Sequence, residues 1–290
     1  MRIQICTPSL DGVPSLEYQT SLIRTNNFML QMGHFIDLNF IRGDQFISKA
    51  RNGLVKGFLE SKEKPDILFF IDDDEGWDEQ AFLRICLDPH GIVCAAVPKK
   101  TDTGEFNNVI LDVADGTTEC TVENGMIRAK QIGTGFMSIK RWALEKLVAA
   151  YPEKYFPGDG GPHTEHYALF DAKIHWPDDP VKALAVLERT CGKRFSDKTL
   201  SLLRSAVKMA APASDKPGQF WGEDLDFCRK WCALGEHIWI DPNVMMHHAG
   251  RKVYSGNFLD YLRKTCAVQM NEPQPQAIPE TLAAIEKLAA

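Results

Sequence analysis

Residues 65–78, PDILFFIDDDEGWD, decide the fold class of this 290-residue chain. The apolar run at 67–71 predicts a strand that is buried on both faces, as is typical of parallel sheets. The run ends abruptly at Asp72, Asp73 and Asp74. Adjacent carboxylates repel one another unless a cation offsets their charge, and Mg²⁺ and Mn²⁺ take oxygen ligands. The three aspartates therefore indicate either a divalent metal site or an acidic turn that caps the next helix.

Strand and helix patterns alternate on both sides of this stretch. Strands are predicted at 2–8, 34–43 and 91–100, and helices at 15–32, 44–61 and 78–88. This order predicts an α/β fold with a doubly wound, mostly parallel sheet and helices on both faces. Ligands bind such sheets at the carboxyl ends of the strands, where Thr7, the three aspartates, Lys99 and Lys100 fall.

The first predicted helix offers one apolar face. Its members are Leu16, Leu22, Ile23 and Leu30, which are spaced so that they can share one face of the helix.

Lys99 and Lys100 allow two interpretations. They neutralise phosphates, or they belong to a solvated loop.

The second half of the chain has shorter elements. The predicted elements are strands at 107–113 and 126–132, a glycine turn and helix at 133–151, a helix at 220–235 and a strand at 237–250. Residues 157–219 are rich in Pro, Gly, Asp and His at both edges and contain two helical patterns, so we expect an insertion there. The tail at 271–290 is expected to end in a peripheral helix.

Composition excludes several classes of protein. The net charge of −6 argues against a general nucleic-acid coat protein, although a local basic patch remains compatible with it. No signal-peptide pattern is visible, and the longest apolar runs fall far short of a membrane span, so we expect a cytoplasmic protein. The eight cysteines show no close-spaced framework and are interpreted as reduced, mostly buried thiols.

Two further constellations carry chemistry. Glu223 and Asp224 follow Trp221 at a predicted helix start. Acids at this position either interact favourably with the helix dipole or supply a general base to a reaction. His247 and His248 end the last predicted strand, and imidazole binds metals such as Mn²⁺. Because adjacent strand residues point to opposite faces, at most one of these histidines should reach a site.

Together these motifs resemble the glycosyltransferases of the GT-A fold, in particular family-2-like members. The resemblance runs from Arg2 to about Phe258 and is strongest in ARNGLVKGFLE, PDILFFIDDDEGW, IGTGFMSIKR, FWGEDLDFCRKW and HHAGRKVYSGNF. It implies that the aspartates form a DxD motif, with Asp72, Asp74 and His248 as ligands of Mn²⁺ or Mg²⁺. It also implies that Asp224, with Glu223, acts as the base of an inverting transfer.

The same resemblance implies a donor site and a division of the chain. The nucleotide-sugar, expected to be a UDP-sugar, would be held by Thr7, Pro8, Ser9, Arg51, Asp72, Asp73, Lys99, Gly133, Gly135 and Trp221. Residues 1–270 would form one catalytic domain. Its nucleotide-sugar-binding half would be 1–100, and its acceptor half would be 101–270, with the helical insertion at about 157–219 before the catalytic helix.

The charge of the insertion suggests an acceptor. Residues 181–217 carry eight basic and three acidic side chains, a net +5 in an otherwise acidic chain, and Arg204 and Lys208 share a helical face. Some phage-type enzymes of this appearance glycosylate hydroxymethylated pyrimidines in DNA. We therefore expect the hydroxymethyl group of a modified pyrimidine in DNA, such as 5-hydroxymethylcytosine, as acceptor. A flipped base would stack on Trp221.

Other functions compete with this interpretation. The acceptor can instead be a saccharide or a protein side chain. A nucleotidyltransferase shares the sheet and the acidic metal site, but it usually has a basic, glycine-rich loop after the first strand, and CTPSLDGVPS lacks the basic residues. A non-catalytic nucleotide-sugar-binding module would leave Asp224 without a chemical task.

Overall fold

The computed structural model describes residues 1–107, 109–113, 119–156, 165–175, 199, 201–202, 219–266 and 268–270. The chain divides into two compact units, one formed by Met1–Asp171 with Glu223–Ala290 and the other by Ala172–Gly222. In the second unit, β12 (Lys173–His175) pairs antiparallel with β13 (Gln219–Trp221). Most of the predicted insertion, including Arg204 and Lys208, lies outside the described residues, as does the tail at 271–290.

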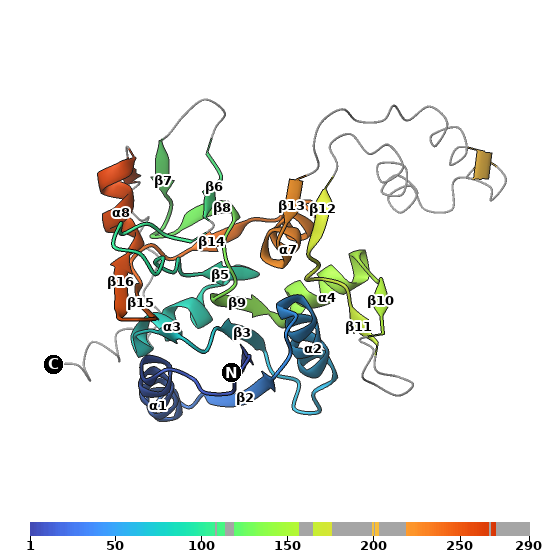
Figure 1. The fold of residues 1–290 in the computed structure, drawn as a ribbon, viewed down its shortest axis with the longest axis horizontal. Coiled ribbons are helices and arrows are strands. Elements are labelled where there is room, and N and C mark those ends of the chain that lie inside the picture. The colour runs from blue at the N-terminus through green and yellow to red at the C-terminus, as the bar shows by residue number, and fades with distance from the viewer. Residues whose placement is uncertain are drawn as a thin grey trace. The chain divides into compact units, whose positions relative to one another are not determined.

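The first unit is built on an eight-stranded sheet (Figure 1). Its order is β2 (Phe35–Arg42), β1 (Arg2–Ser9), β3 (Ile67–Ile71), β9 (Phe136–Lys140), β5 (Ile92–Cys94), β14 (Ile238–Ile240), β8 (Ile127–Gln131) and β6 (Ile110–Leu111). The pairings make β8 and β9 run against the other six strands. The sheet is thus mixed, with most of its strands pointing one way.

Helices pack on both faces of this sheet because the strand side chains alternate between two buried clusters. Phe69 and Ile71 of β3 pack with side chains of α1 (Leu16–Gln31) and α3 (Glu79–Leu87). Leu68 and Phe70 point the other way. They pack with α2 (Ile47–Glu60), α4 (Arg141–Ala150), α7 (Glu223–Cys232) and α8 (Phe258–Thr265).

Small sheets complete the first unit. In the one that matters for the site, β15 (Met245–Ala249) lies between β16 (Val253–Asn257) and β4 (Glu75–Gly76). Two further strand pairs join β10 (Lys154–Tyr155) to β11 (His166–Tyr167) and β7 (Cys120–Val122) to β17 (Val268–Met270). Within the part of the chain that the structure describes, no helix has the length and apolar character needed to cross a bilayer.

The predicted face of the first helix is wrong. α1 buries Tyr18, Ser21, Thr25 and Met29, whereas Leu16, Ile23 and Leu30 are exposed. The polar residues tolerate burial because Trp77 satisfies them. Its backbone N–H donates to Ser21 Oγ over 3.0 Å, and its indole N–H donates to Thr25 Oγ1 over 2.8 Å.

Two strands also depart from the sequence prediction. Residues 136–140, expected in a turn leading into a helix, form β9, which lies between β3 and β5 and is antiparallel to both. The single strand expected at 237–250 is two strands, because the chain turns at Asp241, whose carboxylate accepts the Asn243 N–H over 2.9 Å. β14 joins the central sheet and β15 joins the small sheet with β4.

Candidate active site

A pocket of about 290 Å³ opens at the carboxyl ends of β3 and β5 in the first unit. It lies where α2, the turn before β9, the start of α7 and β15 converge, and each of these elements contributes at least one residue. The lining residues are Ile47, Arg51, Asp72, Glu75, Val97, Asn107, Ile132, Gly133, Thr134, Gly135, Glu223, Asp224 and His248. This set includes seven of the residues predicted for the site, drawn from segments far apart in the sequence.

Arg51 is a buried cation facing this pocket. Its side chain is 4% exposed, and its Nη2 donates to Asp72 Oδ1 over 3.0 Å. Its Nε lies 3.6 Å from Glu223 Oε1, and its guanidinium lies over the Phe70 ring at 5.3 Å. Nε and Nη1 are buried and have no hydrogen-bond partner among the described residues. Buried donors without partners are costly, so this guanidinium is suited to an anionic ligand such as a diphosphate.

The three aspartates point in three directions. Asp72 faces Arg51 and the pocket. Asp73 accepts a hydrogen bond from the Ser9 hydroxyl, and burial raises its pKa despite that bond. Asp74 pairs with Lys100 and lies near His248. Burial acts to raise the pKa of Asp74, but the His248 and Lys100 side chains outweigh it and lower the pKa.

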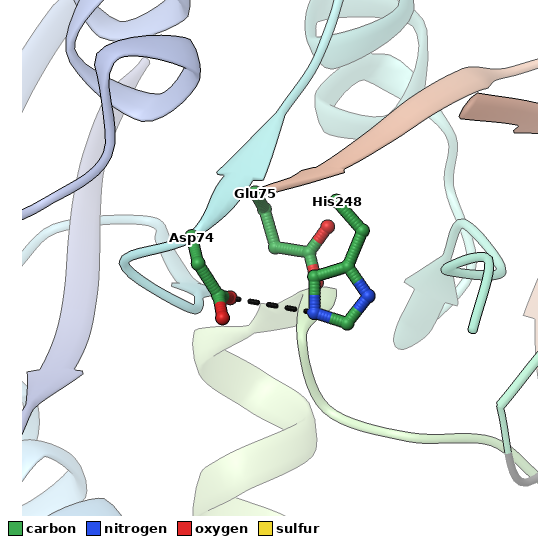
Figure 2. A group of neighbouring side chains, drawn as sticks. All are labelled: Asp74, Glu75 and His248. Carbon is green, nitrogen blue, oxygen red and sulfur yellow. Dashed lines mark ion pairs between the residues drawn. The ribbon is translucent and has the colours of Figure 1, made fainter. Parts of the chain in front are cut away.

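The possible metal ligands are Asp74, Glu75 and His248, which Figure 2 shows pointing toward one another. One ligand atom from each lies within 4.8 Å of the others. His248 Nε2 is 3.6 Å from Asp74 Oδ1 and 3.7 Å from Glu75 Oε1. β4 and β15 create this arrangement, because their antiparallel register places Glu75 opposite His248.

Glu75 was not predicted from the sequence. It is 1% exposed, and its Oε2 has no hydrogen-bond partner in the part of the chain that the structure describes. Burial, together with the charges of Asp72 and Asp74, raises its pKa well above the usual range. A buried carboxylate in this state lacks a cation to offset it. The run of acids at 72–75 was visible in the sequence, but the pairing of β4 with β15 that buries the fourth acid was not.

His248 is held in an orientation that suits metal binding. Its Nδ1 lies 2.7 Å from the carbonyl oxygen of Pro98, an acceptor only, so Nδ1 carries the proton and donates it. In the neutral ring this leaves the Nε2 lone pair facing two carboxylates, where a cation fits between them. His247 points elsewhere, with its Nδ1 2.7 Å from Ser255 Oγ. The donor set, the orphaned Glu75 oxygen and this tautomer therefore fit a divalent cation.

The acids at the start of α7 have different surroundings. Glu223 leans toward Arg51, whereas Asp224 lies beside the turn that precedes β9. A Cβ at Gly133 would lie 3.9 Å from Asp224 Oδ2. A Cβ at Gly135 would lie 3.2 Å from Glu75 Oε1 and 3.3 Å from Asp72 Oδ2, closer than most side chains tolerate. The glycines thus keep the turn close to the carboxylates.

Several residues predicted to hold the donor do not line this pocket. Thr7 is buried and its hydroxyl lies 2.7 Å from the Tyr18 hydroxyl. Pro8 and Ser9 end β1, where the Ser9 hydroxyl donates a hydrogen bond to the Asp73 carboxylate. Lys99 pairs with Glu105 at 2.8 Å, and it is Lys100 that reaches Asp74. Trp221 lies in β13 of the second unit.

No protein-family model and no curated protein matches the chain. Among solved structures it is similar to A197 from STIV, with 16% identity, a TM-score of 0.46 and coverage of 89% of this chain and 95% of that one. It is also similar to a glycosyltransferase involved in the glycosylation of the major capsid of PBCV-1, with 12% identity, a TM-score of 0.29 and coverage of 56% and 72%.

A third similarity is to the 4-diphosphocytidyl-2C-methyl-D-erythritol synthase of Anaerococcus prevotii, with 8% identity, a TM-score of 0.27 and coverage of 71% and 96%. None of the three reaches a TM-score of 0.5. We therefore take no function from them and infer the function from the chemistry of the pocket.

Proposed function

We propose that this protein is a divalent-metal-dependent glycosyltransferase that moves a sugar from a nucleotide-sugar donor to an acceptor hydroxyl. The observation that carries the proposal is the content of one pocket. It joins a buried guanidinium with unpartnered donors, Glu75 and His248 of the set that fits a cation, and two acids at a helix start. Asp74, the third member of that set, lines a separate hollow with Asp73 and Gly250. Diphosphate binding, charge neutralisation and proton removal are the three tasks that sugar transfer from such a donor needs.

Each side chain has a place in this reaction. Arg51 would bind the diphosphate through its guanidinium, which lines the pocket, and Asp72 would keep the guanidinium in position. A cation held by Asp74, Glu75 and His248 would neutralise charge on the leaving diphosphate. Asp72, predicted as a metal ligand, is instead engaged by Arg51, although it stays within reach of the pocket.

Asp224 is the better candidate for the general base. Glu223 Oε1 lies 3.6 Å from Arg51 Nε and anchors the guanidinium, whereas Asp224 lines the pocket beside Gly133. It would take the acceptor proton as the hydroxyl attacks the anomeric carbon opposite the diphosphate, so we propose inversion at that carbon. Proton NMR of the product anomer against the donor tests this assignment.

The proposal as a whole is tested by nucleoside diphosphate release. We expect release from one or more of a panel of nucleotide sugars in Mn²⁺ or Mg²⁺ and none in EDTA, with UDP-sugars as the first candidates. Release of pyrophosphate from a nucleoside triphosphate and a sugar phosphate would instead identify a nucleotidyltransferase. Tight nucleotide-sugar binding without turnover, across all acceptors offered, would identify a binding module.

The acceptor proposal rests on the net +5 of residues 181–217. We propose 5-hydroxymethylpyrimidine DNA over a saccharide or protein. Its binding should weaken steeply with salt, and reversal of Arg204 and Lys208 to Glu should weaken it further without reducing donor hydrolysis. Absence of labelled-sugar transfer to such DNA, single- or double-stranded, would reject this acceptor and leave the glycosyltransferase proposal standing.

A further inference from the structure

Lys100 lies at the metal cluster but has no task in the reaction above. Its ammonium forms an ion pair with Asp74 Oδ2, on the carboxylate whose other oxygen faces His248. Its charge also acts on Glu75, where it opposes the rise in pKa. A monovalent cation therefore already offsets part of the negative charge of the ligand set that a divalent cation would use.

The loop that carries Lys100 contacts the cluster at two points, through the Lys100 ammonium at Asp74 and through the Pro98 carbonyl at His248. Backbone bonds close it, from Lys99 N to Glu105 O over 2.8 Å and from Asn107 N to Val97 O over 3.0 Å. The carbonyl oxygen of Pro98 in the same loop accepts the hydrogen bond from His248 Nδ1. One closed loop thus positions a ligand and supplies a competing charge.

The path of the lysine side chain also depends on Gly250. A Cβ at this position would lie 3.1 Å from Lys100 Cδ and 3.4 Å from Tyr254 Cε2. The lysine stem crosses the glycine because no side chain is there. Its approach to Asp74 is therefore supported by two segments, the closed loop and the chain after β15.

We propose that Lys100 is a resident counter-ion of the Asp74, Glu75 and His248 cluster, which an incoming divalent cation must displace from Asp74. This inference rests on the proposed metal site. Because like charges a few ångströms apart repel, the lysine weakens metal binding in the nucleotide-free protein. The metal should therefore bind more tightly when an anion, such as the donor diphosphate, pairs with the Lys100 ammonium in place of Asp74.

The test is a Mn²⁺ titration of metal-free, nucleotide-free protein, with free Mn²⁺ followed by electron paramagnetic resonance. We expect Lys100→Met to tighten the Kd by about tenfold. The matched control is Lys99→Met, which removes the same charge one residue away, where the ammonium pairs with Glu105. Its Kd should stay within about twofold of the wild type, and Lys100→Arg should bind like the wild type because the charge remains.

A second variant displaces the lysine without removing it. Gly250→Ala should shift the stem by a few tenths of an ångström and move the Kd in the same direction as Lys100→Met by a smaller factor. Thermal melting in EDTA confirms that each variant is folded. An unchanged or weaker Kd in Lys100→Met, or an equal shift in Lys99→Met, would overturn the inference. Normal Mn²⁺ binding without any sugar transfer would overturn the glycosyltransferase proposal alone. Metal-independent sugar transfer by a wild type and a Lys100→Met variant that both fail to bind Mn²⁺ would overturn the inference and the metal dependence, and would leave the assignment of sugar transfer standing.

Discussion

Replacement of Arg51 by methionine should reduce the free energy of unfolding by about 2–3 kcal/mol. Breaking a fully buried ion pair costs about 3–5 kcal/mol, because the remaining charge stays desolvated. Here Asp72 is 33% exposed and Glu223 is 17% exposed, so water solvates the remaining carboxylates in part and the expected loss falls just below that range. The methionine keeps the apolar contact with Phe70, which limits any added packing loss.

The assay is urea unfolding in EDTA, where no metal contributes. Arg128→Met is the matched control, because Arg128 also combines an ion pair, with Glu123 at 2.8 Å, and a cation–π contact, with Trp239 at 5.2 Å. Its side chain is 41% exposed, so its loss should cost no more than about 1 kcal/mol. Equal costs for the two variants would refute the reasoning from burial. Donor binding should fall in Arg51→Met and stay unchanged in Arg128→Met.

Three further predictions concern the metal ligands, the base and the thiols. Glu75→Gln should abolish Mn²⁺ binding yet stabilise the metal-free protein, because the pKa of Glu75 is higher in the folded than in the unfolded chain and the wild type therefore loses stability as pH rises above about 4.5. Urea unfolding from about pH 4.5 to 8 should show a growing difference in unfolding free energy between the variant and the wild type. Asp224→Asn should lower turnover by ~100-fold and leave donor binding near normal. The control is Asp260→Asn, at an exposed aspartate in the first turn of α8, which should match the wild type in steady-state assays, and normal turnover in Asp224→Asn would make Asp224 a helix cap. Burial raises the pKa of Cys94 and Cys228, so iodoacetamide at about pH 8 should label the partly exposed Cys266 and leave both buried thiols unmodified in the folded protein. Early labelling of Cys94, detected by mass spectrometry, would contradict this prediction.

Local sequence was sufficient where one segment decides its own structure. The apolar run before Asp72 is a fully buried strand, and the aspartates do lie at its carboxyl end. It was insufficient where distant segments decide burial. α1 turns Ser21 and Thr25 inward because Trp77 supplies donors from another part of the chain.

The same limit applies to the site. Arg51, Asp224 and His248 could be named from motifs, and the structure places all three in one pocket. Glu75 could not, because its burial depends on the register between β4 and β15. The choice of Lys100 over Lys99 at Asp74 depends on the closed loop that carries them both.

The order of the central sheet determines when this site can first exist in a newly made chain. β3 and β5 are close in sequence, yet β9 separates them and β14 must arrive from residues 238–240 to cover β5. Contacts between such distant segments form slowly, since a large loop must close before each one is made. A chain released before residue 240 would present apolar strand edges and no complete pocket. It is therefore expected to aggregate.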